Sequence, residues 1–344
     1  MMKKLLFATA LLAPGLAYGG NPSADLSVQV VPAGTAGTCG TITGQAATDA
    51  AAAGFGTCAL YNDFTTAIPN TVGTGLPSNW LNCSNTYVAG SVWNMPTYNP
   101  PCNAITQVTD SGGGGNLALD LHYNRAWMVQ ASQYDNFTEM VSSSWDGSDP
   151  PSAYGKVGFS NGYFEITARM TADTGSFAGE QQAFWSWICC TTNLTFVEQD
   201  FFEDWSTGGQ HMDIAWDWWT GPPLTGQGFA NGTSYPAHTQ SDYHTFGTLI
   251  TGNYASFAVC NYFDGTRIGC YNQSYKSGQD GTQRRTLWVQ NGAQCNTGVY
   301  GDIRCVGSFN DSHMYIKSIK AVTCAAEPAG GSCIGNTYNG NFYQ

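Results

Sequence analysis

Short runs of alternating apolar and polar residues, separated by turn signals, follow one another along the chain from Leu60 onward. β-Branched and aromatic residues dominate these runs, as is typical of strands that bury one face. No run beyond Leu60 shows the three-to-four-residue apolar spacing of an amphipathic helix. The pattern predicts an all-β fold, a two-sheet antiparallel β-sandwich of the jelly-roll type. Its clearest predicted turns are Ser111–Gly115, Asn161-Gly162, Gly208-Gly209 and Asp264-Gly265.

The two ends of the chain lack this alternation. Residues 1–19 carry the basic start, short apolar core and small-x-small end of a secretory signal, and no later stretch is apolar enough to span a membrane. Residues 20–57 are predicted to form an N-terminal extension. Within it, residues 33–57 are rich in Ala, Gly and Thr and resemble a loop or linker held by Cys39 and Cys58. Residues 58–324 form the predicted β domain, and residues 325–344 a C-terminal tail.

Charge narrows the possible partners. The chain has 24 acidic and 12 basic residues, and removal of the signal with Lys3 and Lys4 leaves 10 basic residues and a net charge of 10 − 24 = −14. Such a surface repels nucleic acid and anionic membranes, and mildly disfavours a sulfated polysaccharide. A neutral substrate is expected.

The cysteines predict disulfides and an extracellular location. All twelve lie after the signal, without a Cys-x-x-Cys pair, and the five histidines show no zinc spacing, so no metal site is predicted. Cys260 and Cys270 flank Asp264-Gly265-Thr266, where a three-residue hairpin loop would set them opposite each other. Cys295 and Cys305 are separated by the same interval.

The candidate chemistry lies in Phe196–Trp205, where Glu198, Asp200 and Glu203 occur among aromatic residues. A strand puts Glu198 and Asp200 on one face and Glu203 on the other, and one extra residue in a bulge would bring all three to one surface. Two carboxyl groups about 5 Å apart can cleave a glycosidic bond with retention of configuration. The alternatives are a solvated acidic strand end or a calcium site, which the aromatic flanks disfavour.

Several further stretches, in order, resemble glycoside hydrolase family 16, the laminarinase- and lichenase-like β-jelly rolls. The resemblance covers about residues 60–322. Its segments are Leu60–Phe64, Leu76–Trp80, Gly114–Leu119, Asn161–Arg169, Ala183–Trp187, the carboxylate motif, Asp242–Phe246, Tyr262–Gly265 and His313–Ile319. The resemblance implies a concave substrate cleft, with Glu198 as nucleophile, Glu203 as general acid/base and Asp200 between them. The motif's spacing is similar to the bulged variant of laminarinase-like members.

Two positions depart from the family pattern. Gln199 stands where the family has an apolar residue facing the space between the sheets, and Val197 stands where Gly is common. A buried glutamine at this place needs hydrogen-bond partners. Because crowded carboxylates cannot all ionise easily, one is expected to keep its proton, and this is Glu203 if Glu198 is the nucleophile.

Aromatic residues near the motif are candidates for stacking on sugar rings. The predicted substrate-binding residues are Trp185, Trp187, Trp205, His211 and Trp218. Trp185 and Trp205 are favoured as substrate contacts over core residues. For Trp216, Trp218 and Trp219 both interpretations stay open, and alternation puts Trp219 on the opposite face. His211 fits a structural turn equally well.

A rival motif, Gly158-Phe-Ser-Asn-Gly162, matches the Gly-x-Ser-x-Gly of serine hydrolases. That elbow requires a following helix, whereas Tyr163–Met170 reads as a strand and Asn161-Gly162 as a hairpin turn.

The sequence thus predicts a secreted retaining endo-glycosidase acting on a neutral β-glucan with 1,3 or mixed 1,3/1,4 linkages. A transglycosylase with the same residues and a non-catalytic carbohydrate-binding or structural surface protein are the alternatives. No cofactor is predicted, although the resemblance allows a structural Ca²⁺, and the oligomeric state is left open.

Overall fold

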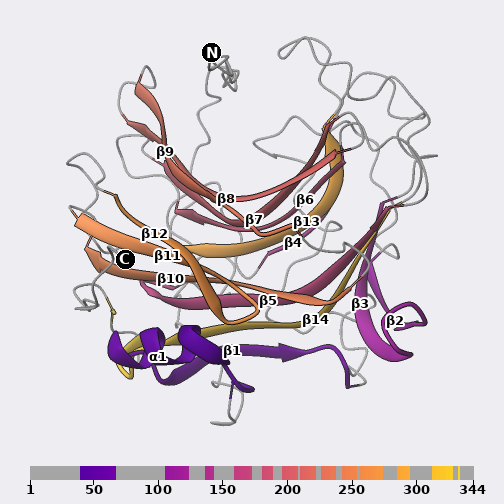
Figure 1. The fold of residues 1–344 in the computed structure, drawn as a ribbon, viewed down its shortest axis with the longest axis horizontal. Coiled ribbons are helices and arrows are strands. Elements are labelled where there is room, and N and C mark those ends of the chain that lie inside the picture. Colours follow the sequence, from indigo (N-terminus) through magenta and orange to yellow (C-terminus); the bar gives the residue numbers. More distant parts are fainter. Residues whose placement is uncertain are drawn as a thin grey trace, which may run out of the picture.

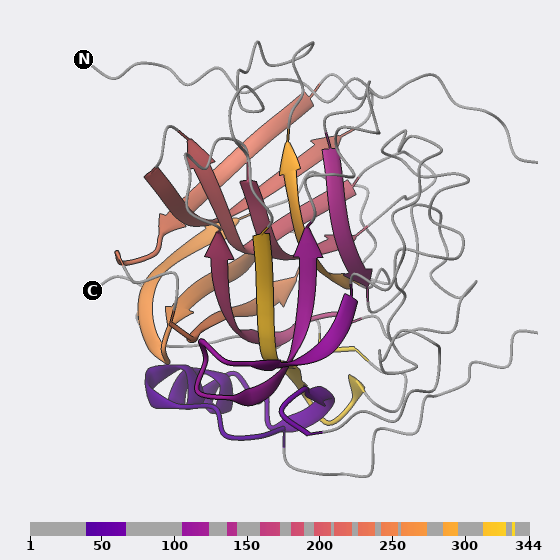
Figure 2. The ribbon, with the colours of Figure 1, turned by 90° about the vertical axis from the view of Figure 1, so that its right-hand side faces the viewer.

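The computed structural model describes residues 39–66, 105–123, 136–142, 159–172, 180–188, 196–207, 210–221, 226–237, 242–253, 256–273, 285–294, 312–327 and 332–333. Two antiparallel sheets stack on each other, which confirms the predicted all-β sandwich (Figures 1 and 2). Among these residues no helix is long and apolar enough to cross a membrane.

The eight-stranded sheet has the order β12-β11-β10-β5-β14-β3-β2, and β1 also pairs with β14. Its strands are β1 (Thr57–Asp63), β2 (Ile105–Asp110), β3 (Asn116–Tyr123), β5 (Gly162–Ala172), β10 (His244–Asn253), β11 (Ser256–Phe263), β12 (Thr266–Gln273) and β14 (Ser312–Thr323).

The six-stranded sheet has the order β4-β13-β6-β7-β8-β9. Its strands are β4 (Asn136–Ser142), β6 (Glu180–Ile188), β7 (Phe196–Thr207), β8 (Gln210–Gly221), β9 (Gly226–Ser234) and β13 (Thr286–Gln294). The central strands of this sheet are curved, and their concave side is turned away from the eight-stranded sheet (Figure 1).

Strand alternation places the main core between the sheets. In β5 the side chains of Phe164, Ile166 and Met170 are buried in this inter-sheet core. Tyr163 and Arg169, at the alternate positions, belong to the outer face of the eight-stranded sheet. The same alternation in the six-stranded sheet leaves one set of positions for the concave face.

Helix α1 (Gly44–Ala52) corrects the prediction of a loop over residues 33–57. Ala46 and Ala50 are buried in a second apolar cluster, with Tyr163 and Tyr262 from the outer face of the eight-stranded sheet. Small alanine side chains let the helix lie close to the sheet, and this packing stabilises a helix too short and weakly amphipathic to be read from sequence. Cys39 and Cys58, bonded to each other, close the segment around it.

The predicted pairing of Cys260 with Cys270 is confirmed, but the loop between them differs. The two cysteines are opposite each other in β11 and β12 and form a disulfide. The hairpin loop has two residues, Asp264 and Gly265, both at positive φ (48° and 77°), instead of three. An irregularity farther along β12, between the partners of Asn261 and Tyr262, restores the register.

The predicted C-terminal tail is in part a packed element. Cys324 and Cys333 form a disulfide, and Glu327 and Cys333 are buried. The predicted signal peptide, the Leu76–Trp80 stretch and the Cys295/Cys305 pair lie outside the described residues.

Candidate active site

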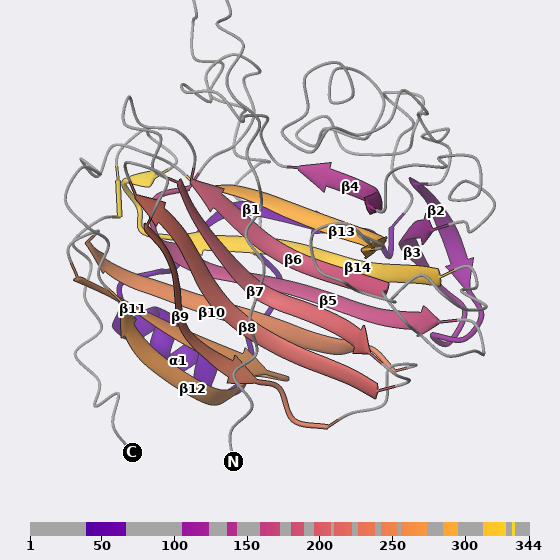
Figure 3. The ribbon, with the colours of Figure 1, turned by 90° about the horizontal axis from the view of Figure 1, so that it is seen from above.

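The carboxylate motif lies in β7, a central strand of the six-stranded sheet (Figure 3). Asp200 is opposite Trp216 of β8, and Glu203 is opposite Ile214, so two residues of β7 face the single Ala215 between them. This irregularity is the bulge predicted from the odd spacing between Asp200 and Glu203. It puts the positions of Asp200 and Glu203 on the same face of the strand, where both side chains are buried.

The bulge is built from the core side. Phe201 and Phe202 are consecutive residues, yet both belong to the inter-sheet core. Phe201 stacks on Phe164 of the other sheet with ring centroids 5.3 Å apart, and Phe202 lies 4.0 Å from Phe246. The bulge lets both rings enter the core opposite the single Ala215. Burial of both rings therefore favours the bulged strand over the regular one.

A hydrogen bond also stabilises the bulge. The Tyr235 hydroxyl, buried next to Phe202, donates to the main-chain carbonyl of Phe201. A bulge interrupts the ladder and leaves main-chain groups in need of partners. Tyr235 supplies one such partner from the end of β9.

Trp185 lies beside the motif, as predicted, and pairs with Asp200 across the β6–β7 ladder. On its other side it is opposite Trp288 of β13, and the two indole rings stack with centroids 5.2 Å apart. Trp185 and Trp288 are only 4% and 3% exposed, but neither belongs to the inter-sheet core cluster. They form a stacked pair of indole rings in the ladder positions next to Asp200.

Sequence reasoning missed Trp288. The available signal is its position in Leu287-Trp288-Val289, where the flanking residues face the inter-sheet core and alternation assigns Trp288 to the other face. Only the pairing of β13 with β6 brings it next to Trp185.

Glu198 and three of the predicted tryptophans are placed by their backbone register. Glu198 pairs with Trp187 of β6 on one side and with Trp218 of β8 on the other. Trp205 pairs with Gln181 and Met212, two positions beyond Glu203 along β7. These register positions alternate regularly with those of Asp200 and Glu203, so they belong to the same face of the sheet.

His211 falls elsewhere in the ladder. It pairs with Ser206, between the Trp205–Met212 pair and the end of β7, and alternation assigns these two positions to the opposite face. Of the two interpretations open for this residue, the backbone favours a histidine near a turn.

Gln199 faces the space between the sheets, as expected, and is 1% exposed. Its side-chain oxygen accepts a hydrogen bond from Nη1 of Arg285, which is also buried. Arg285 Nε donates to the Ser160 carbonyl at 2.9 Å, and its guanidinium lies 5.7 Å from the ring centre of Phe164. The oxygen of the buried glutamine amide thus has a hydrogen-bond partner.

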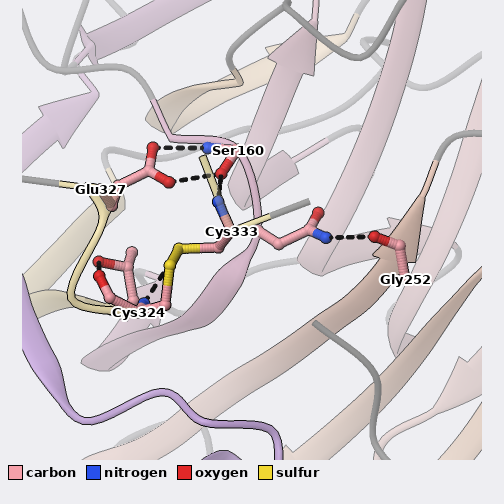
Figure 4. Close-up of a disulfide and its surroundings, with 7 residues drawn as sticks. Ser160, Gly252, Cys324, Glu327 and Cys333 are labelled. Carbon is pink, nitrogen blue, oxygen red and sulfur yellow. Dashed lines mark hydrogen bonds between the residues drawn. A yellow bond between two sulfur atoms is a disulfide. The ribbon is translucent and has the colours of Figure 1, made fainter. Parts of the chain in front are cut away.

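The serine-hydrolase motif serves a structural purpose. Ser160 is buried, and both its main-chain N and its hydroxyl donate to the Glu327 carboxylate (Figure 4). Strand β5 begins at Gly162, so no helix follows the serine and Asn161-Gly162 is not the predicted hairpin turn. A nucleophile elbow requires the opposite arrangement.

Cys324, Glu327 and Cys333 are the one group of potential metal ligands that converges within the described residues. Both sulfur atoms are bonded to each other, and Glu327 is engaged by Ser160. The group therefore does not have the thiolate donors of a metal site. The structural Ca²⁺ that the resemblance allows stays a prediction.

Comparison with solved structures identifies the fold. A glycoside hydrolase family 16 endo-glucanase from Bacteroides ovatus aligns with a TM-score of 0.50 at 12% identity, over 76% of this chain and 99% of that one. LamAcat from Zobellia galactanivorans (15% identity, TM-score 0.47, 78% and 98% coverage) and the κ-carrageenase from Pseudoalteromonas carrageenovora (13%, 0.48, 76% and 92%) also align. No family model and no curated protein matches the sequence. The chain has the jelly-roll fold of the Bacteroides ovatus endo-glucanase.

Proposed function

We propose that the protein is a secreted retaining endo-glycosidase that hydrolyses a β-glucan. The observation that carries this proposal is the bulge in β7, which puts the positions of Asp200 and Glu203 on one face beside Trp185. A bulge disrupts the hydrogen bonds of the ladder and therefore carries a cost in stability. Its occurrence within the carboxylate motif favours a catalytic role for these residues. The fold shared with a family 16 endo-glucanase supports the same conclusion.

In the proposed reaction Glu198 attacks the anomeric carbon while Glu203 donates its proton to the leaving oxygen. The glycosidic bond breaks, and a glycosyl ester forms on Glu198. Glu203, now ionised, takes a proton from water, which attacks the same carbon and releases Glu198. Asp200, two positions from Glu198 on the same strand face, orients the nucleophile and keeps the set of carboxylates coupled.

The aromatic residues fit a neutral polysaccharide. Indole rings stack on the apolar faces of pyranose rings, and the net charge of 10 − 24 = −14 after removal of the predicted signal disfavours a polyanionic chain. We propose β-1,3 or mixed 1,3/1,4 linkages, with Trp185, Trp187, Trp205 and Trp218 as substrate contacts. The three disulfides of the described residues support an extracellular location.

The test is reducing-sugar release by the purified, oxidised protein from laminarin, mixed-linkage glucan, cellulose, agarose and xyloglucan. Glu198→Gln and Glu203→Gln should each lower kcat at least about 100-fold on the active polymer. Asp242→Asn, an equally conservative change at an exposed carboxylate outside β7, should keep wild-type rates. Wild-type kcat in either glutamate variant contradicts the assignment.

A second substrate separates the two roles. A dinitrophenyl glycoside has a leaving group that departs without protonation, so Glu203→Gln should still form the glycosyl-enzyme with it, whereas Glu198→Gln should not. Products longer than the substrate would indicate transfer to an acceptor sugar in place of water. Sugar binding that survives in Glu198→Gln, without turnover by the wild type on any polymer, would favour the non-catalytic alternative.

A further inference from the structure

The residue between the two proposed carboxylates Glu198 and Asp200 is held from the core side. Gln199 accepts a hydrogen bond from Arg285, and the amide and guanidinium are 1% and 2% exposed. The nitrogen of the Gln199 amide has no hydrogen-bond partner among the described residues. A buried amide nitrogen without a partner destabilises the fold, so a core that needed only filling would be more stable with apolar residues at both position 199 and position 285.

Arg285 is itself held by residues 159–161, which lie directly before β5 of the opposite sheet. Its main-chain N and O both bond to Phe159, at 2.7 and 2.9 Å. Its Nε donates to the Ser160 carbonyl, and its Nη2 lies 3.5 Å from the Asn161 side-chain oxygen. A planar guanidinium bonded along several of its edges has one orientation, so it holds Gln199 at a defined position.

The C-terminal disulfide segment holds Ser160 in turn. The Glu327 carboxylate accepts from both the main-chain N and the hydroxyl of Ser160, and the Ser160 hydroxyl accepts from the main-chain N of Cys333 at 2.7 Å (Figure 4). The Cys324–Cys333 disulfide closes the segment that carries Glu327. Buried hydrogen bonds therefore run without interruption from Glu327 through Ser160 and Arg285 to Gln199.

We propose that Gln199 and Arg285 are positioning residues for the carboxylates of β7, and that the Cys324–Cys333 segment holds them through Glu327 and Ser160. This inference rests on the proposed function. Catalytic groups must be held within about 0.5 Å of their productive geometry, and neighbouring positions of one strand share a main chain. Fixing residue 199 from behind therefore fixes the directions in which residues 198 and 200 leave the strand. The guanidinium also adds a permanent positive charge on the core side of β7, opposite the face to which the register assigns the positions of Glu198, Asp200 and Glu203.

The decisive variant is the apolar pair Arg285→Met with Gln199→Leu. Replacing a buried polar pair by apolar residues of similar volume is often neutral or stabilising, so the melting temperature should stay at or above that of the wild type. KM should stay unchanged, because the substrate face is not altered, whereas kcat should fall about 10- to 100-fold through misplacement of the carboxylates. The matched control is Arg169→Met with Asp110→Leu, a buried arginine pair on the outer face of the eight-stranded sheet, which should keep kcat.

Two single changes separate geometry from charge. Gln199→Glu keeps an acceptor for Arg285 but neutralises the pair, so retained kcat supports the positioning role, whereas a loss as large as that of the apolar pair assigns the effect to charge and overturns it. Glu327→Gln puts an amide donor opposite the Ser160 donors and should lower kcat less than the apolar pair does.

The outcomes are distinct. An active wild type and an apolar pair with wild-type kcat and melting temperature overturn this inference and leave the proposed function standing. A loss of kcat that is matched by an equal loss in the Arg169/Asp110 control also overturns it. No turnover by the wild type on any polymer overturns both.

Discussion

Tyr235 shows how one hydroxyl outside the motif bears on the candidate site. It donates to the carbonyl of Phe201 at the bulge, while its ring packs on Phe202 and Phe246. The ring contributes apolar burial that a phenylalanine would keep. The hydroxyl contributes only the hydrogen bond, so removal of this one oxygen atom separates the hydrogen bond from the burial of the ring.

We expect Tyr235→Phe to lower the free energy of unfolding by about 1–2 kcal/mol, because the Phe201 carbonyl loses a buried partner. A looser bulge should also reduce kcat several-fold without changing KM. Urea denaturation and steady-state kinetics on the active polymer measure the two effects. Tyr61→Phe, which removes a hydroxyl from a side chain that is 37% exposed, is the control. An unchanged unfolding free energy in Tyr235→Phe would mean that the hydrogen bond contributes nothing net.

The bulge was predictable at the residue level because successive side chains of a strand alternate strictly between its two faces. Glu198 and Glu203 are an odd number of residues apart, so a single functional face demands one irregularity between them. The same reasoning placed Trp185 beside Asp200 and Gln199 toward the core. It could not find Arg285 or Trp288, because both come from a segment far along the chain whose pairing with β6 only the fold reveals.

At the scale of elements, β7 combines a bulge with a core of two adjacent phenylalanines. Deletion of Phe201 would leave one residue between Asp200 and Glu203, and plain alternation would then keep the three carboxylate positions on one face. The deletion removes the stacking on Phe164 and the edge-to-face contact with Phe184. The bulge and the core contacts therefore make separate contributions, to stability and to the placement of Glu203.

We predict that the Phe201 deletion lowers the unfolding free energy by about 3–5 kcal/mol, as for loss of a buried aromatic side chain, but hydrolyses the polymer faster than Glu203→Gln. Deletion of Gln199 is the comparison, because it puts the positions of Glu198 and Asp200 on opposite faces and should abolish turnover. Circular dichroism and thermal melting establish that each variant is folded. A folded Phe201 deletion no more active than Glu203→Gln would show that strand parity alone does not place the carboxylates.

Helix α1 marks the limit of element prediction from sequence. Its alanines and its glycine at position 44 give little periodic signal, and its stability comes from the outer face of the eight-stranded sheet, where Tyr262 donates to Asp49 at 2.8 Å. By contrast, the Cys260–Cys270 hairpin was readable because turn and disulfide signals agreed. Features that local residues determine could be predicted from the sequence, whereas an element stabilised by tertiary packing, such as α1, could not.

At the scale of the whole molecule, a buried ion pair joins β2 to β5 and, through Tyr243, to the residues before β10 on the outer face of the eight-stranded sheet. Asp110 ends β2, Arg169 lies in β5, and Tyr243 precedes β10. The Asp110 carboxylate accepts from the Arg169 guanidinium and, at 2.7 Å, from the Tyr243 hydroxyl. Burial raises the pKa of Asp110, but the hydrogen bonds from Arg169, Tyr243 and the Gly113 main chain outweigh it and hold the pKa below its usual range.

This pKa shift makes the stability of the fold depend on acid. Because the carboxyl group binds its proton more weakly in the folded than in the unfolded chain, its contribution is fully present above the ordinary aspartate pKa of about 3.9 and is lost as the pH falls through the lowered value. Asp110→Asn should lower the unfolding free energy at pH 7 by about 3 kcal/mol, since it leaves the buried Arg169 charge without its partner. Below about pH 4 the difference between wild type and variant should shrink toward zero.

Denaturant unfolding of both proteins from pH 7 down to pH 2 measures that difference directly, and subtraction removes the titration of every carboxylate that the two proteins share. Asp242→Asn, at an exposed position next to Tyr243, controls for the loss of one surface charge and should give a small difference at every pH. The proposed catalytic carboxylates lie on the other sheet, so the specific activity of the folded Asp110→Asn protein at neutral pH should equal that of the wild type. A difference that stays constant across the acid range would show that Asp110 titrates alike in the folded and unfolded chain, and that its pairing with Arg169 holds the strand ends by packing alone.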